Sequence, residues 1–267
     1  MALLLLLTLF CCSLLMLVAW RVQQASGNST WVDVAWTFGT GAIGILLTLW
    51  PLPGHGPVTT RQVLVSIAAA AWALRLGSHL LRRALKGRDD PRYADLKTSW
   101  GAAYVWKMPV FLQLQGLSVY VLGLFIMLAG RNPAPGPGVL DIIAILVALA
   151  AIIGEAVADR EVARFAAEPA NRGTICEIGL WGWSRHPNYF CEWLIWVVYA
   201  LFAISGFAWF WGVLAWAGPI VMYAVLVHGS GIPPTEAHML RSRGDAFRDY
   251  QRRVSAFFPL PPKRNRT

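Results

Sequence analysis

Several charged side chains lie inside or at the edges of long apolar stretches of this chain, and each is a candidate for a functional role. Asp33 lies near the start of one stretch, and Arg75 lies in the next, one helical turn before His79. Glu155 and Asp159 share a helix face at the end of another. A charge in the apolar interior of a membrane costs about 2.5–3.5 kcal/mol on insertion scales, so each one needs a reason. Their similar depth predicts a shared polar cavity, with plain ion pairing, such as Asp33 with Arg75, as the structural alternative.

The densest polar motif is the run Trp-Ser-Arg-His-Pro-Asn-Tyr-Phe-Cys-Glu at 183–192. Its proline suits the first turn of a helix, and the free N–H groups of a helix start beside Arg185 and His186 predict an anion site. Glu192 follows Asn188 by one turn, where it can accept hydrogen bonds from an amide or a ribose. The structural alternative is an interfacial belt of tryptophan and tyrosine side chains.

The elements that position these residues are predicted to be transmembrane helices. The chain is 57% hydrophobic and only 14% charged, too apolar for an ordinary soluble domain. Its apolar runs are roughly 18–22 residues long, the length that crosses the hydrocarbon core. We expect an all-α integral membrane protein with a single membrane domain over 1–267 and a cytoplasmic tail at 229–267. The seven expected spans are 2–20, 31–50, 62–81, 108–129, 139–158, 189–205 and 207–228.

The basic residues predict the orientation. The segments 82–107, 159–188 and 229–267 hold seven, four and eight lysines or arginines, whereas the alternate loops hold one each, Arg61 and Arg131. The positive-inside rule therefore puts the N-terminus outside and the C-terminus in the cytoplasm. The same bias explains the net charge of +9 without a nucleic-acid partner.

The remaining composition is uninformative about chemistry. The four cysteines, at positions 11, 12, 176 and 191, fit neither a disulfide framework nor a zinc site. We therefore predict no metal centre.

The first apolar stretch is expected to be a retained helix, because it has neither a basic start nor a small-residue cleavage site.

The motif at 185–192 resembles the C-terminal cofactor signature of the steroid 5-alpha-reductase-like integral membrane family, above all its bacterial members of uncharacterised function. The tail is similar to that family's charged C-terminal motif in Thr235–Leu240, Phe247–Tyr250 and Phe257–Pro259. The resemblance is good over about residues 140–262 and loose before them. It implies a bacterial inner-membrane protein with its active site facing the cytoplasm.

The resemblance implies that NADPH binds between the last helices and the cytoplasmic loops. Asn188 and Glu192 match positions near the nicotinamide, and Asp159 matches an aspartate on the cofactor. Arg88 loosely matches an arginine near the adenine-side phosphate. The full expected cofactor set is Arg88, Asp159, Arg164, Trp183, Ser184, Arg185, His186, Asn188, Tyr189, Glu192, Glu236, Arg243 and Tyr250.

The resemblance also implies a reaction. The expected activity is the NADPH-dependent reduction of a conjugated carbon–carbon double bond in a lipid-soluble enone, steroid-like or isoprenoid. Asp33 falls where the animal enzymes have a glutamate that holds the substrate ketone, and a protonated Asp33 would donate to that oxygen, with Arg75 and Tyr104 as assistants. The tyrosine that those enzymes use beside the glutamate has no counterpart, since Trp72 takes its place.

Two other functions stay open. Membrane methyltransferases that act on a lipid or a prenylcysteine carboxylate also carry an Arg-His-Pro-x-Tyr motif and a tail carboxylate, here Glu236, and they use S-adenosylmethionine. Glu192 and the arginine-rich segment 82–107, suited to extra phosphates, favour the reductase. A non-enzymatic lipid-binding or assembly protein is the third reading. The expected partners are a lipid-soluble substrate and membrane lipids; the sequence leaves the oligomeric state open.

Overall fold

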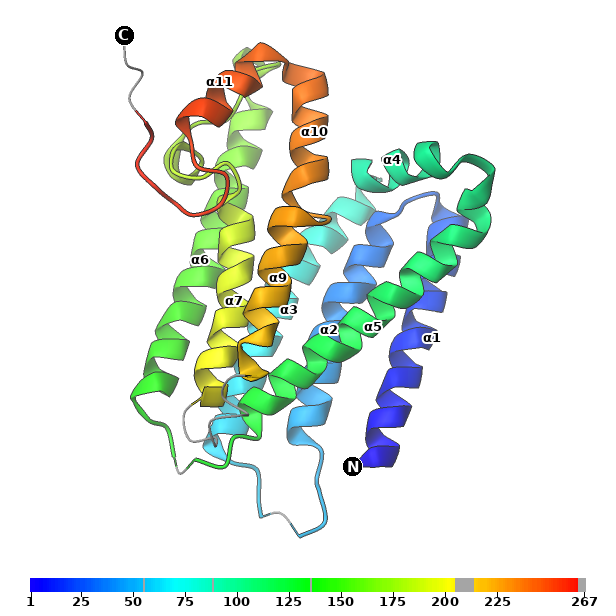
Figure 1. The fold of residues 1–267 in the computed structure, drawn as a ribbon, viewed down its shortest axis with the longest axis vertical. Helices are drawn as coiled ribbons and strands as arrows, with labels where there is room; N and C mark the ends of the chain where they lie inside the picture. Colours follow the sequence, from blue (N-terminus) through cyan, green and yellow to red (C-terminus); the bar gives the residue numbers. More distant parts are fainter. Residues whose placement is uncertain (55, 88, 135, 205–213, 264–267) are drawn as a thin grey trace. The chain divides into compact units, whose positions relative to one another are not determined.

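A computed structural model describes residues 1–54, 56–87, 89–134, 136–204 and 214–263, and within these ranges the regular elements are helices (Figure 1). The all-α prediction is therefore confirmed. The chain divides into two compact units. Unit 1 comprises residues 1–143 and 199–215, and unit 2 comprises 144–198 and 216–267.

Six segments are long and apolar enough to cross a membrane, which confirms an integral membrane protein. They are α1 (Ala2–Ser26), α2 (Thr30–Leu49), α3 (Thr60–Leu85), the segment Pro91–Gly130 that ends in α5 (Tyr104–Gly130), α6 (Val139–Ala167) and α7 (Pro187–Ile204). The expected seventh span, 207–228, falls partly outside the described residues. Its described part is the helix α9 (Ala217–His228).

Unit 1 is built on α2, which packs against α1, α3 and α5. Small residues allow these helices to approach closely, as is usual between helices in membranes. A Cβ atom added at Gly44 of α2 would lie 2.5 Å from the Ile126 side chain of α5, and one at Gly41 would lie 2.5 Å from Ala73 of α3. Larger residues at these positions would force the helices apart.

The basic segment 82–107, predicted as a long loop, is mostly helical. It contains the last residues of α3, the short helix α4 (Pro91–Trp100) and the start of α5 at Tyr104. Asp90 caps α4, because its side chain accepts a hydrogen bond from the Arg92 N–H, and Pro91 occupies the first turn. Figure 1 shows α4 at the end of unit 1 where α2 and α5 begin.

The opposite end of unit 1 is held by two arginines, Arg61 in the first turn of α3 and Arg131 directly after α5. Arg61 binds both carboxylate oxygens of Asp141, each at 2.8 Å, and donates to three backbone carbonyls of the 131–138 loop. Arg131 donates to the carbonyls of Leu47 and Trp50 at the end of α2. Both arginines thus satisfy backbone groups that a helix end or turn leaves unpaired.

In unit 2, the helices α10 (Ile232–Arg243) and α11 (Asp245–Arg253) are followed by a tail that folds back on the segment 183–185, just before α7. The Arg185 N–H donates to the Ser255 carbonyl at 2.8 Å, and the Leu260 N–H donates to the Trp183 carbonyl at 3.0 Å. Phe257, only 3% exposed, packs among aromatic rings of α7 and α9. The tail is therefore an integral part of unit 2.

Candidate functional site

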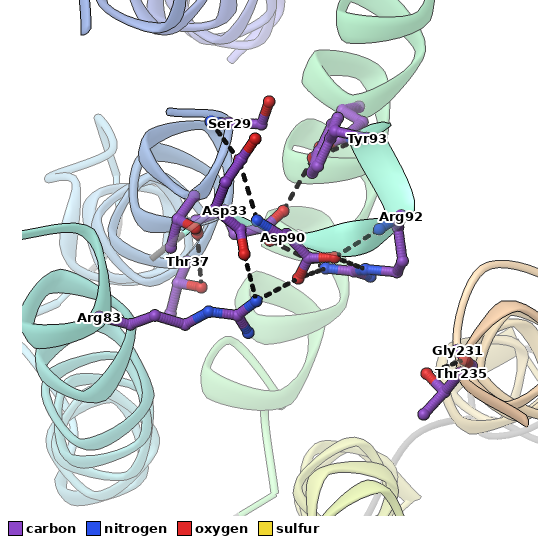
Figure 2. Close-up of polar contacts among 12 residues, drawn as sticks. Ser29, Asp33, Thr37, Arg83, Asp90, Arg92, Tyr93, Gly231 and Thr235 are labelled. Carbon is purple, nitrogen blue, oxygen red and sulfur yellow. Dashed lines mark hydrogen bonds and ion pairs between the residues drawn. The ribbon is translucent and has the colours of Figure 1, made fainter. Parts of the chain in front are cut away.

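The charged residues at the α4 end of unit 1 form one connected group, the Asp33 cluster (Figure 2). The cluster comprises Asp33, Arg83, Asp90, Arg92, Tyr93 and Gln115. The Tyr93 hydroxyl donates to Asp33 Oδ1 at 2.9 Å, and Arg92 Nη2 donates to Asp33 Oδ2 at 2.8 Å. Gln115 Nε2 donates in turn to the Tyr93 oxygen at 3.3 Å. A hydrogen-bond chain from α5 through α4 thus ends on a carboxylate of α2.

A second carboxylate balances the charge of this cluster. Asp90 accepts from Arg92 Nε at 2.9 Å and lies 3.4 Å from Arg83 Nη2. Burial by itself would raise the pKa of Asp90, but the hydrogen bonds and charge of Arg92 outweigh it and hold that pKa below its usual range. Two carboxylates thus face two guanidinium groups in the Asp33 cluster, with Tyr93 as its uncharged hydrogen-bond donor, and a third carboxylate, that of Asp89, accepts from the Asp90 N–H beside them.

The arrangement differs from the expected one in three respects. Asp33 pairs with Arg92, whereas the structural alternative of the sequence paired it with Arg75. Both of its carboxylate oxygens accept hydrogen bonds, so Asp33 is an acceptor here, and the donor is Tyr93. Tyr104, the expected assistant, instead accepts a hydrogen bond from Gln23 Nε2 at 2.9 Å.

Tyr93 is the residue that the sequence analysis missed. Trp72, which takes the place of the family's tyrosine in the sequence, is fully buried against Trp36 of α2. A tyrosine does lie beside the Asp33 carboxylate, but it comes from α4. The Asp90-Pro91 capping signal could have identified α4, although not its contact with a residue 60 positions earlier.

In unit 2, Arg185, His186 and Gln251 converge on Glu236 of α10. Arg185 Nε donates to Glu236 Oε1 at 2.7 Å, His186 Nε2 lies 3.1 Å from the same oxygen, and Gln251 Nε2 donates to Oε2 at 2.7 Å. Burial alone would raise the pKa of Glu236, but these hydrogen bonds and the charge of Arg185 lower it from 4.5 to about 2. We call Arg185, His186, Glu236 and Gln251 the Glu236 cluster.

This geometry corrects the expected anion site at the start of α7. Arg185 also donates to the carbonyls of Gln251 and Val254, so its guanidinium is held by protein acceptors. The carboxylate of Glu236 takes the place that the sequence analysis gave to a phosphate. Arg185 and Glu236 therefore form an internal ion pair, with side chains 10% and 13% exposed.

Three further residues of the expected cofactor set, Tyr189, Ser184 and Tyr250, also form contacts within the protein. The His186 ring stacks on Tyr189, with centroids 5.3 Å apart, and the Tyr189 hydroxyl lies 3.3 Å from that of Thr235. Ser184 Oγ donates to the carbonyl of Phe257 in the tail. The Tyr250 hydroxyl donates to the Trp181 carbonyl at 2.6 Å. Ser184 and Tyr250 thus position the tail against the motif.

The start of α7 holds the feature that points most directly to a ligand. The helix begins at Pro187, as predicted, and places Asn188 and Glu192 one turn apart. Asn188 Oδ1 is buried and has no hydrogen-bond partner among the described residues. Glu192 is 7% exposed and accepts a hydrogen bond from Trp196 Nε1 at 3.3 Å. An amide oxygen buried without a partner costs about 1–3 kcal/mol, so it suits a ligand that donates a hydrogen bond.

Residues 19–254 match the family described as "Protein of unknown function (DUF1295)". The chain belongs to the DUF1295 family. The match begins in α1 and ends just after α11, so it includes both the Asp33 cluster and the Glu236 cluster. An uncharacterized protein of fission yeast, Schizosaccharomyces pombe, is 25% identical over 272 residues. The alignment covers 91% of this chain and 76% of the yeast protein. No solved structure matches.

The other expected cofactor ligands of this DUF1295 protein have diverse surroundings. Asp159 is partly buried on α6, and Arg164 is exposed near the end of that helix. Trp183 is half exposed. Arg243 Nε is buried without a hydrogen-bond partner among the described residues. Arg88 lies outside the described residues.

Proposed function

We propose that this DUF1295 membrane protein is an NADPH-dependent reductase of a conjugated carbon–carbon double bond in a lipid-soluble, steroid-like or isoprenoid enone. The resemblance of the 185–192 motif and of the tail to the steroid 5-alpha-reductase-like family suggests the reaction. The observation that carries the proposal is the buried amide oxygen of Asn188, which lies beside Glu192 and has no hydrogen-bond partner in the described part of the chain.

These two side chains fit a nicotinamide. The carboxamide NH₂ group of NADPH can donate to Asn188 Oδ1, and Glu192 offers a second acceptor one turn further along α7. Both groups are buried, so the hydrogen bonds would form away from competing water. Bound NADPH supplies the hydride of the reaction.

The phosphates of NADPH need cations that the protein has not already paired. Arg185 is excluded by its ion pair with Glu236. Exposed Arg164 on α6 is one candidate in unit 2, because arginine binds phosphate through two parallel hydrogen bonds. Arg88 remains a candidate from the resemblance.

The second requirement of the reaction is a hydrogen-bond donor for the substrate oxygen, and the Asp33 cluster contains one. As the β-carbon of the enone gains a hydride, negative charge develops on the carbonyl oxygen. Tyr93 would donate its hydroxyl hydrogen to that oxygen, while Gln115 and Arg92 hold the tyrosine and Asp33 in place. A proton from solvent then adds to the α-carbon, which gives the saturated ketone and NADP⁺.

One observation favours the second candidate, a methyltransferase that uses S-adenosylmethionine. The Glu236 cluster is electrically balanced by Arg185, so it offers no unpaired cation for a phosphate. A site without an unpaired cation is less suited to the phosphates of NADPH than to S-adenosylmethionine, which carries no phosphate. The substrate would then be a lipid or a prenylcysteine carboxylate.

Titration calorimetry in mild detergent separates the two candidates. We expect NADPH to bind more tightly than NADH, and Asn188→Ala and Glu192→Gln to weaken NADPH binding about ten- to a hundred-fold each. Ser242→Ala and Glu168→Gln make matched changes at exposed positions and should leave binding unchanged. Binding of S-adenosylmethionine that depends on His186 and Glu236, with no nicotinamide cofactor bound, would replace the reductase by the methyltransferase.

We also propose that the C-terminus faces the cytoplasm of a bacterial inner membrane, from the distribution of basic residues. A reporter that is active only in the cytoplasm should therefore be active when it is fused after Thr267. A periplasmic signal would reverse the orientation, and the proposed NADPH site would then lack access to the cytoplasmic nucleotide pool.

A further inference from the structure

We infer that α4 is a hinged arm that Asp33 latches shut, and that the arm must open before a lipid-soluble substrate reaches Tyr93. The identity of the substrate rests on the proposed function, whereas the arm and its latch rest on contacts within unit 1. Opening and reclosing of α4 would thereby control access to the hydrogen-bond donor that the reaction needs.

The two ends of the arm are glycines in conformations that other residues rarely adopt. Gly87, before α4, has a φ of 67°, and Gly101, after it, has a φ of 51°. A Cβ atom added at either position would meet nothing within 4 Å. No side chain packs against either glycine, so the glycine backbone can take up the rotation that opening requires once Asp89 releases its hydrogen bonds to Ser29 and Arg83.

The first turn of the arm makes polar contacts with the rest of unit 1, and the ring of Tyr93 is also buried in the apolar core. Arg92 and Tyr93 both bind Asp33, and Asp90 pairs with Arg83. Just before the helix, Asp89 accepts a hydrogen bond from the Ser29 N–H at 2.7 Å. Polar contacts of this kind can be exchanged for water at a membrane surface at little net cost.

The second half of the arm is only lightly attached. Leu96 and Trp100 are partly buried against the apolar core of unit 1, and the Trp100 ring meets Phe111 edge-on, with centroids 6.0 Å apart. The outward-facing positions, among them Thr98, are exposed. The arm therefore covers an apolar surface that becomes accessible when α4 swings out.

Asp33 is the latch because one carboxylate receives both of the arm's donors. The Tyr93 hydroxyl has a single hydrogen, which points to Asp33 Oδ1 in this structure. A substrate oxygen must therefore compete with Asp33 for that hydrogen. Replacing Asp33 by asparagine keeps the shape of the side chain but removes the charge that binds Arg92, and it should release the arm.

Cysteine labelling tests the latch without cofactor or substrate. In a Cys11→Ala background, Leu96→Cys places a thiol beneath the arm, and Thr98→Cys places one on its outer face. Adding Asp33→Asn should raise the rate at which a membrane-impermeant maleimide labels position 96 about ten-fold, the effect of losing roughly one net hydrogen bond. Asp245→Asn, the same change at a fully exposed ion pair, should leave that rate unchanged.

Two readouts keep the test decisive. Position 98 should be labelled equally fast in every variant, and native Cys12, buried in α1, should stay unlabelled because the fold is intact. Equal labelling rates at position 96 with and without Asp33→Asn, whether slow or fast, would overturn the latch. The calorimetric test of NADPH binding concerns unit 2, so a failure there would leave the labelling result, and the arm, standing.

Discussion

The two ends of unit 1 each carry an arginine–aspartate pair at the same distance but with different surroundings. Arg61 Nη2 lies 2.8 Å from Asp141, and Arg92 Nη2 lies 2.8 Å from Asp33. The first two side chains are 3% and 0% exposed, whereas the other two are 33% and 16% exposed. The two ion pairs therefore have the same N–O distance, and they differ in how deeply the side chains are buried and in their other hydrogen bonds.

Arg61 has an acceptor for each of its five N–H groups, two on Asp141 and three on backbone carbonyls. No donor is left for a ligand, so this pair holds the loop structure. Arg92 donates to the carboxylates of Asp33 and Asp90, and that of Asp33 also accepts the Tyr93 hydroxyl. The comparison suggests that a fully satisfied, buried pair stabilises the fold, whereas a partly exposed pair that shares its acceptor is free to change partners.

The largest expected effect is at the buried pair. Arg61→Leu leaves Asp141 as a buried charge without its main partner, which should cost about 3–5 kcal/mol of unfolding free energy. Unfolding by sodium dodecyl sulfate in mixed micelles measures it. The double variant Arg61→Leu, Asp141→Leu should recover much of the loss, because no uncompensated charge remains. A loss no larger than that of Arg92→Leu would break the comparison.

The Arg185–Glu236 pair of unit 2 is intermediate in exposure and should be intermediate in effect. Because the pKa of Glu236 is depressed from 4.5 to about 2, its ionised form contributes stability above pH 4.5, and this contribution is lost as the pH falls toward 2. Glu236→Gln should cost roughly 2–3 kcal/mol at pH 7. Unfolding measured against pH should show the difference between the two proteins shrinking below pH 4.5. A difference that stays constant down to pH 2 would contradict the assignment.

Local sequence patterns were enough to predict much of the fold. Apolar run lengths identified six helices, although α6 extends nine residues beyond its predicted end at 158. Pro187 marked the start of α7. The rarity of basic residues in alternate loops was read only as an orientation signal, yet Arg61 and Arg131 also bind backbone carbonyls there.

The candidate sites were predictable only where their residues are close in sequence. Asn188 and Glu192 share one helix turn, so their spacing was visible. The partners of Arg185 and Asp33 were not, because Glu236 lies 51 positions after Arg185 and Tyr93 lies 60 positions after Asp33. Whether a cation is free for a ligand depends on such distant partners, which is why the expected phosphate site became an internal ion pair.

The smallest effect on stability should come from changing Arg92 of the arm. This variant tests the comparison between the two ion pairs of unit 1 most directly. Arg92→Gln removes a charge from a pair that is one-third exposed on the arginine side, so it should cost at most about 1 kcal/mol of unfolding free energy. The same change removes one of the two donors that hold Asp33, so maleimide labelling of Leu96→Cys should still accelerate several-fold. Arg248→Gln, in an exposed pair with Asp245, is the matched control and should change neither quantity. A large loss of stability would make Arg92 a structural residue like Arg61, whereas small stability loss with unchanged labelling would leave α4 attached by its apolar face, through Leu96 and Trp100, and not by its ion pair.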